Sequence, residues 1–377
     1  MDFSLTDEQA SLADMVNRLF EQEHDPQTRR KLAADVNFVP ATIWPKMAEL
    51  GLLGLFVPEA LGGLAGTELH DSAAATHLVA KSVGRHLVAE PFISTAVVAA
   101  SLIAEVGSPQ LQASFLPGLA EGRVRIAVAA GPWTEGEQAT APKAVPRSDG
   151  AYRLEGQTSA IDANNAQWLV VPAWVQAAGG LALCLISADG PGAIVQRGRT
   201  LDGTEVVRIE LQGVAVPGEQ IIAQPEHGGG AWRRALHRGI AALMAEAVGA
   251  MERLLEMTVD YMKTRKQFGR PLAEFQALRH YLADMRTAVE QATSLSLAAT
   301  AASLEPDAAT AAQTISAAKY MIGRLSRLVA EQSVQVHAGI GMTEELSVGH
   351  YFRRLIAIDA TWGNAQQHLD RYALRMG

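Results

Sequence analysis

The segment 264–271 (TRKQFGRP) places a guanidinium, an amide and an aromatic ring close together, at Arg265, Gln267 and Phe268. A guanidinium suits a pyrophosphate, which it binds through paired charge-assisted hydrogen bonds, and an aromatic ring suits an adenine or a packed backbone. The alternative interpretation is that Arg265 and Lys266 form a solvated helix end. The residue types are therefore compatible with binding a pyrophosphate and an adenine at this segment, but they do not establish it.

Other reactive side chains carry weaker signals. His280, His337 and His350 lack metal-ligand spacing, so we interpret them as structural histidines and expect no metal site. The single cysteine, Cys184, lies in the apolar run LALCLIS, where a buried, inert thiol is the better interpretation. The Gly-bearing stretches GLAGTELHD and EHGGGAW lack a strand-to-helix phosphate pattern and are predicted to be loops.

Composition narrows the class of protein that positions these residues. The chain has 377 residues, is 48% hydrophobic and 19% charged, and carries a formal net charge of −8. A net negative charge argues against a nucleic-acid surface, which needs clustered Lys and Arg. The N-terminus does not resemble a signal peptide, and the most apolar stretch, 92–104, is too short to span a bilayer. We expect a cytoplasmic protein that does not enter membranes.

Hydrophobic periodicity and proline positions predict helices, then strands, then helices. Thr6 precedes Gln9 by three residues, the pattern of a capping box, and helical patterns continue to about residue 116. Six short runs rich in branched and aromatic residues follow and predict strands: RIAVAAG, AYRLEGQ, QWLVVPAWV, LALCLISA, GAIVQRG and VVRIELQGVAV. After Pro225 only two prolines remain, so residues 226–377 are predicted to form a bundle of about four long helices.

Five segments together resemble the acyl-CoA dehydrogenase family, flavoenzymes that desaturate acyl thioesters. The strongest is TRKQFGRPLAEFQALRHYLADM, residues 264–285. The other four occur in the family's order and spacing: AELGLLGLFVPEALGG, AVAAGPWTEGEQAT, AEAVGAMERLLEMTVDY and SVQVHAGIGMTEELSVGHYFRRL. The C-terminal end is most similar to bacterial two-subunit members, such as the small subunit of pimeloyl-CoA dehydrogenase.

The resemblance implies a mainly α fold with a β middle domain. It consists of an N-terminal α domain (1–118), a central β-sandwich or barrel-like domain (119–224) and a C-terminal four-helix bundle (225–377). Members form dimers or tetramers in which FAD lies at a subunit interface. The implied substrate is an acyl-CoA thioester, and the implied partner is a second copy or a second family member.

The same resemblance implies which residues contact FAD. Arg265, Gln267 and Phe268 reach the ADP half of a FAD held mainly by a neighbouring subunit, and Gln335 and Gly339 match other ADP contacts. Thr134 and Thr140 match hydroxyls at the flavin ring, and surface-loop threonines are the alternative. Asn364 takes the place of a threonine that follows the catalytic glutamate.

Three positions depart from the family's flavin-binding pattern. Ala160 and Asp162 stand where a Trp and a Thr usually face the isoalloxazine ring. An acidic group beside the ring disfavours the anionic reduced flavin. Ala338 replaces a usual Gly, and its methyl group crowds the backbone approach to the cofactor. We expect weakened FAD binding at this chain's own ring site.

The family's general base is also missing. A carboxylate, usually a Glu followed by Gly, takes the α-proton while a hydride leaves to the flavin. Here Trp362 precedes Gly363, and an indole cannot accept a proton. A minority of members carry the base at the start of the first bundle helix, where this chain reads WRRALHRGI without a carboxylate. His237 and Glu246 are the weak candidates that remain.

These departures leave three hypotheses. The first is a subunit that lacks its own catalytic residue within a hetero-oligomeric acyl-CoA dehydrogenase. The second is an active homo-oligomeric flavoenzyme with an unusual base or a related reaction on a CoA thioester. The third is a flavin-free binding or scaffold protein on the same fold. A flavin that bleaches with an acyl-CoA in the pure chain would favour the second.

Overall fold

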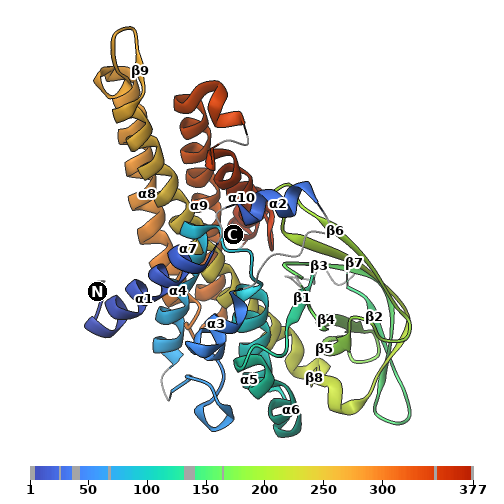
Figure 1. The fold of residues 1–377 in the computed structure, drawn as a ribbon. Coiled ribbons are helices and arrows are strands. Elements are labelled where there is room, and N and C mark those ends of the chain that lie inside the picture. The colour runs from blue at the N-terminus through green and yellow to red at the C-terminus, as the bar shows by residue number, and fades with distance from the viewer. Residues whose placement is uncertain are drawn as a thin grey trace.

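A computed structural model describes residues 5–24, 27–35, 43–66, 69–130, 141–163, 165–343 and 346–374. Helices at the N-terminal end, a sheet in the middle and long helices at the C-terminal end follow one another along the chain (Figure 1). The predicted fold class, mainly α with a β middle domain and a C-terminal helical bundle, is confirmed.

The N-terminal helices pack around one apolar core. Helix α1 (Asp7–Glu23) begins with the predicted capping box, in which Thr6 and Gln9 bond to each other's backbone. The π-helical segment η3 (Phe92–Ala99) is buried along its whole length. The remaining helices are α2 (Thr28–Ala34), α3 (Trp44–Glu49), α4 (Leu69–His86), α5 (Ala100–Val106) and α6 (Pro109–Ala120).

The middle region is an eight-stranded sheet in the order β6-β7-β3-β1-β4-β5-β8, with β2 paired to β3 and β4. Six strands match the six predicted runs: β1 (Ile126–Ala129), β3 (Tyr152–Ile161), β4 (Trp168–Val175), β5 (Gly180–Ser187), β6 (Ala193–Arg199) and β7 (Glu205–Val216). The short strands β2 (Lys143–Pro146) and β8 (Ile221–Ala223) complete the sheet.

Strands β4 and β5 are buried on both faces. In β5, Leu183 and Leu185 join the core shared with the helices, whereas Ala182 and Cys184 join the core of the β region. Side chains alternate across a strand, so one strand serves both cores. Burial raises the pKa of the Cys184 thiol to about 12, which makes it unreactive as predicted.

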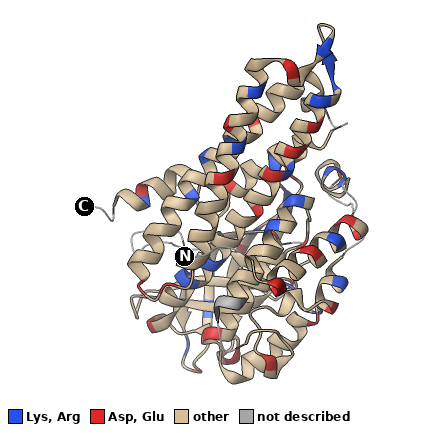
Figure 2. Cartoon of the chain, turned by 90° about the vertical axis from the view of Figure 1, so that its left-hand side faces the viewer, with Lys and Arg blue, Asp and Glu red and all other residues tan. Residues whose placement is uncertain are grey.

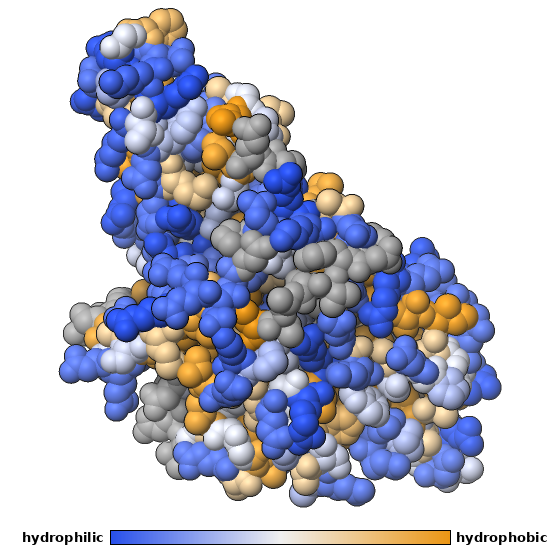
Figure 3. Space-filling model, in the orientation of Figure 1, coloured by the Kyte–Doolittle hydropathy of each residue, from blue (hydrophilic) through white to orange (hydrophobic). Residues whose placement is uncertain are grey.

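The C-terminal helices are built on α7 (Pro225–Thr264), a continuous helix of 40 residues. The stretch EHGGGAW, predicted to be a loop, lies in the first turns of this helix, so that prediction is wrong. It packs against α8 (Gln276–Ala302), α9 (Ala308–His337), α10 (Val348–Ala360) and, across the domain border, α4. The C-terminal end of α7, the start of α8 and the hairpin between them project from the molecule as an arm (Figures 1 and 3). Buried residues of α8 begin only at Met285, so the tip of the arm is solvent-exposed on this chain.

Within the described residues, no helix combines the length and hydropathy that crossing a membrane requires. The same residues also contain no group of three His, Cys, Asp or Glu side chains placed to hold a metal ion.

Candidate active site

A short turn between α10 and α11 (Ala365–Ala373) carries the residue at the expected position of the base. Trp362 and Gly363 both have left-handed backbone conformations, with φ of 53° and 99°. A positive φ is costly for a tryptophan, so the surrounding contacts must fix the turn. The Asn364 side chain caps α11 by accepting a hydrogen bond from the amide of Gln367 (2.9 Å).

Three buried or half-buried side chains hold this turn. The Lys319 ammonium donates to the carbonyl oxygens of Ile358 (2.6 Å) and Asp359 (3.1 Å) at the end of α10. Asp359 Oδ1 accepts from the Ala365 amide (3.1 Å), and His368 Nε2 lies 3.1 Å from the Trp362 carbonyl oxygen. Burial lowers the pKa of Lys319 to about 8, although Asp359 opposes this shift.

The indole of Trp362 lies against helix α7 at Gly239. A Cβ atom at Gly239 would be 2.6 Å from Cζ3 of Trp362 and 2.5 Å from Cγ2 of Val98 on η3. Gly239 belongs to the stretch 232–240, where a minority of acyl-CoA dehydrogenases would carry their base. The residue at the usual base position therefore contacts the stretch considered for the alternative base, and the contact joins a tryptophan ring to a glycine.

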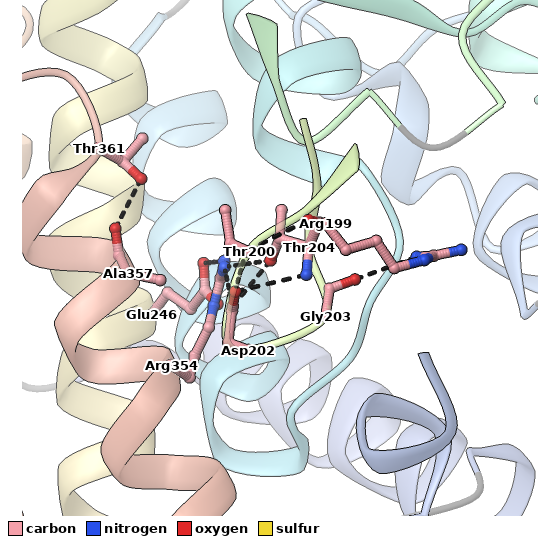
Figure 4. A network of polar contacts seen from close by, with 9 residues as sticks. All are labelled: Arg199, Thr200, Asp202, Gly203, Thr204, Glu246, Arg354, Ala357 and Thr361. Atoms are coloured by element: carbon pink, nitrogen blue, oxygen red, sulfur yellow. Dashed lines mark hydrogen bonds and ion pairs between the residues drawn. The ribbon is translucent and has the colours of Figure 1, made fainter. Parts of the chain in front are cut away.

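Glu246, the carboxylate considered as an alternative base, is engaged elsewhere. Both of its oxygens accept from the Arg354 guanidinium of α10, at 2.6 and 2.9 Å (Figure 4). Arg354 also donates to Asp202 and Thr204 in the turn between β6 and β7, each at 3.0 Å. Burial opposes the charge of Arg354, but Glu246 and Asp202 outweigh it and raise the pKa of Arg354 above its ordinary value. Glu246 is thus an ion-pair partner, which argues against a base role.

His237 lies near the turn that carries Trp362. It is buried on α7, two residues before Gly239, and it is close enough to His368 to contribute to lowering the pKa of that ring. The pKa of His368 falls to about 3, first because of burial and then because of Lys319 and Arg371. A neutral His368 therefore persists at physiological pH.

The two positions expected to face the flavin ring lie in or beside the protein interior. Ala160 is buried in the core of the β region, and Asp162 follows it with a left-handed φ of 59°. Ser94 Oγ of η3 lies 3.1 Å from the Asp162 carbonyl oxygen and 3.2 Å from its carboxylate. The Asp162 charge also acts on Arg354. Thr134 and Thr140 lie outside the described residues.

The expected ADP-binding residues, in contrast, are displayed outward. A two-residue turn at Phe268 and Gly269, with φ of 52° and 80°, joins β9 (Lys266–Gln267) to β10 (Arg270–Pro271). Both central residues are left-handed, as in a type I′ hairpin. Phe268 is 90% exposed, and Figure 2 shows basic residues gathered at this tip.

Comparison with known proteins agrees with this geometry. The model "Acyl-CoA dehydrogenase, N-terminal domain" matches residues 6–123, and "Acyl-CoA dehydrogenase, C-terminal domain" matches residues 226–377. The acyl-CoA dehydrogenase IpdE2 of Mycobacterium tuberculosis is 30% identical over 355 residues, covering 92% of this chain and 91% of the relative. The chain belongs to the acyl-CoA dehydrogenase family. This family comprises FAD-dependent oxidoreductases that act on acyl-CoA thioesters.

Two solved structures of family members are similar over almost their full length. The ChsE4–ChsE5 complex from Mycobacterium tuberculosis has a TM-score of 0.87 and 27% identity, covering 100% of this chain and 99% of that chain. A variant of the Tcur3481–Tcur3483 steroid ACAD has a TM-score of 0.85 and 28% identity, covering 98% of this chain and 97% of that chain. The name of each structure joins two proteins.

The remaining ADP-binding candidates of this family member lie at the C-terminal end of α9. Gln335, Ala338 and Gly339 are all exposed there, and Ala338 has a left-handed φ of 53°. The end of α9 is fixed from behind, since His337 stacks on Tyr261 of α7 with 4.3 Å between ring centroids. This arrangement leaves open space beside Gly339 for an approaching group.

These observations divide the family's cofactor site into two halves. The ring half does not fit a working flavin, because it offers a half-buried carboxylate at Asp162, a shortened side chain at Ala160 and an indole at the place of the base. The ADP half fits the chemistry of a pyrophosphate and an adenine, because Arg265, Gln267 and Phe268 are exposed at the tip of the arm.

Sequence reasoning missed the residues that shape the site from behind: Gly239, Lys319, Arg354 and His368. One signal was available. Lys319 lies among the apolar positions Ile315 and Ile322 of α9, at helical spacing, and is only 1% exposed. A lone lysine on an apolar helix face predicts a buried partner.

Proposed function

We propose that this chain is a subunit of a two-subunit acyl-CoA dehydrogenase and lacks its own catalytic residue. The observation that carries this proposal is the packing of Trp362 against Gly239, since the family's usual base position holds an indole that cannot accept a proton and the stretch 232–240 carries no carboxylate. The partner would supply the catalytic glutamate and hold the flavin ring. The two-protein names of ChsE4–ChsE5 and Tcur3481–Tcur3483 support such an assembly.

The contribution of this chain is the projecting hairpin. Arg265 would pair with the pyrophosphate of a FAD bound by the partner, while Gln267 and Phe268 would lie against its adenosine end. The left-handed φ of Phe268 costs about 1–2 kcal/mol, and its ring is almost fully exposed on the isolated chain. Contact with a partner's ligand would offset that cost.

The test compares the full chain purified alone with the chain co-expressed with a second family member from the same genome that retains its glutamate. We expect the lone chain to carry little flavin and not to bleach with octanoyl-CoA under anaerobic conditions. We expect the complex to be yellow and to bleach. A yellow homo-oligomer of this chain that bleaches would refute the proposal.

Hairpin variants assign the flavin contact within that complex. Arg265→Ala should weaken FAD retention roughly tenfold, the loss of one charge-assisted hydrogen bond. Phe268→Asn keeps a residue that tolerates the left-handed turn but removes the ring, so it should weaken retention without unfolding the hairpin. Arg286→Ala is the matched control, because Arg286 is an exposed arginine of the same arm that forms an ion pair with its helix neighbour Glu290.

A further inference from the structure

The indole of Trp362 occupies a space enclosed by elements from both ends of the chain. Gly239 of α7 lies under the ring, and Val98 of η3 also borders the space above this glycine. Trp362 itself packs against the core that both helices share. Because Gly239 has no side chain, the ring can approach the helix backbone closely.

The backbone that carries this ring is fixed on both sides. Lys319 bonds two carbonyl oxygens before the turn, and His368 contacts the Trp362 carbonyl oxygen from α11. The capping box of Asn364 and Gln367 then fixes the first turn of α11. A displacement of the turn that carries the indole would have to break several of these polar contacts, each of which is costly to lose.

Beside the indole site, η3 also contacts Asp162. Ser94 and Val98 lie about one turn apart on η3, and Ser94 binds Asp162 while Val98 borders the indole site. Asp162, Asp202, Glu246 and Arg354 place several charges in this interior. Buried charges exclude an apolar chain, since their hydrogen bonds would be lost on its entry.

We propose that Trp362 plugs this chain's own acyl site, so that the indole replaces the part of a substrate next to its thioester. The reasoning rests on the proposed function, in which the family's base removes a proton from the α-carbon and therefore touches it. A side chain much larger than a glutamate at that place fills the position of the α-carbon as well. Packing of the indole thus excludes acyl groups from this site, in addition to the absence of a base.

The test measures binding of octanoyl-CoA to the full-length chain purified alone, by isothermal titration calorimetry. Wild type should bind octanoyl-CoA no more tightly than it binds free CoA. Trp362→Ala should bind octanoyl-CoA at least about tenfold more tightly than wild type, which corresponds to burial of about two methylene groups. Free indole should compete with octanoyl-CoA in this variant and raise its melting temperature.

Two control variants separate an opened site from general loosening. Trp362→Phe keeps an aromatic ring in the space and should remain closed. Trp174→Ala truncates another half-buried tryptophan, in β4 of the β region, and should gain no binding. Trp362→Leu serves in place of Trp362→Ala if the alanine variant does not fold, and it should show a smaller gain.

Two results would overturn the plug. Wild type that binds octanoyl-CoA as tightly as Trp362→Ala would show an open site, and a truncated variant that binds indole but not octanoyl-CoA would show a cavity unrelated to substrate. Either result leaves the subunit proposal intact, because that proposal is decided by flavin content and bleaching of the co-expressed complex.

Discussion

At Gly239 the absence of a side chain determines what can lie against the middle of helix α7. The surrounding atoms leave no room for even a methyl group, because both Val98 and Trp362 lie within 2.6 Å of where it would be. The glycine and the tryptophan are therefore complementary in size. A substitution at either position should be felt at the other.

Gly239→Ala should destabilise the protein, although alanine is the better helix former by about 1 kcal/mol. Overpacking of a buried site costs about 1–3 kcal/mol, which exceeds that gain. Urea unfolding of the variant should show the loss. Combining it with Trp362→Ala should recover much of the stability lost at position 239.

Gly229→Ala is the matched control on the same helix. Its nearest outside atom would be an Arg233 nitrogen at 3.9 Å, so the added methyl group meets no obstacle. We expect this variant to be slightly more stable than wild type. Equal destabilisation by both alanines would mean that contact with Trp362 is not the reason.

At the scale of single elements, the turn before α11 shows that an asparagine can be read either as a flavin contact or as a helix cap. Asn364 was predicted to contact flavin, and the structure uses its side chain as a helix cap. The pattern Asn-Ala-Gln-Gln, with Gln367 three residues after Asn364, was readable as a capping box.

Asn364→Ala should lower the free energy of unfolding by about 1 kcal/mol through loss of the cap. Asn364→Asp keeps a capping oxygen and should retain near-wild-type stability. Thermal unfolding followed by circular dichroism measures both. If Asn364 instead served mainly as a ligand contact, the two variants would be equally stable while differing in flavin content of the complex.

Elements that carry their own sequence pattern were predicted, whereas features that depend on residues distant in the chain were not. Five of the predicted strands and the long helices carry their own pattern over seven or more residues, and the four residues of β1 lie in the longer apolar run RIAVAAG. Strands β2 and β8, of four and three residues, are too short for such a pattern and form because longer strands lie beside them. The Arg354 cluster could not be predicted, since its partners lie 108 and 152 positions away in the chain.

At the scale of the whole molecule, that cluster joins separate regions. Arg354 comes from α10, Glu246 from α7, and Asp202 and Thr204 from the β region, all buried (Figure 4). A buried ion pair contributes little net stability, yet breaking it leaves charges without compensation. The cluster therefore specifies how the sheet is seated against the bundle.

Arg354→Leu should destabilise the protein by about 3–5 kcal/mol, because Glu246 and Asp202 remain buried without their counter-charge. Chemical denaturation should report this loss. Arg327→Ala is the control: Arg327 pairs with Glu331 on the surface of α9, and its loss should cost under about 0.5 kcal/mol. Similar costs for both variants would refute a special role for the cluster.

Stability should also fall as the pH drops from about 6.5 to about 4. Burial lowers the pKa of His77 to about 4 and that of His368 to about 3, whereas both rings have pKa values near 6.5 when unfolded. Between these values the unfolded chain binds more protons, so acid favours unfolding, by up to about 3 kcal/mol for His77.

His77→Gln should flatten this pH dependence, and His280→Gln, at an exposed position, should leave it unchanged. Urea denaturation at pH 7, 5.5 and 4.5 provides the comparison. A wild-type-like slope in His77→Gln would assign the acid sensitivity to other groups.

The inert thiol of Cys184 has a practical consequence. The chain has one cysteine, and it is fully buried in the core of the β region. A cysteine introduced at Lys266 in the hairpin would be the only thiol open to a maleimide reagent. Fluorescent labelling of the arm then needs no prior removal of the native residue, and the dye would report directly on docking of a second protein.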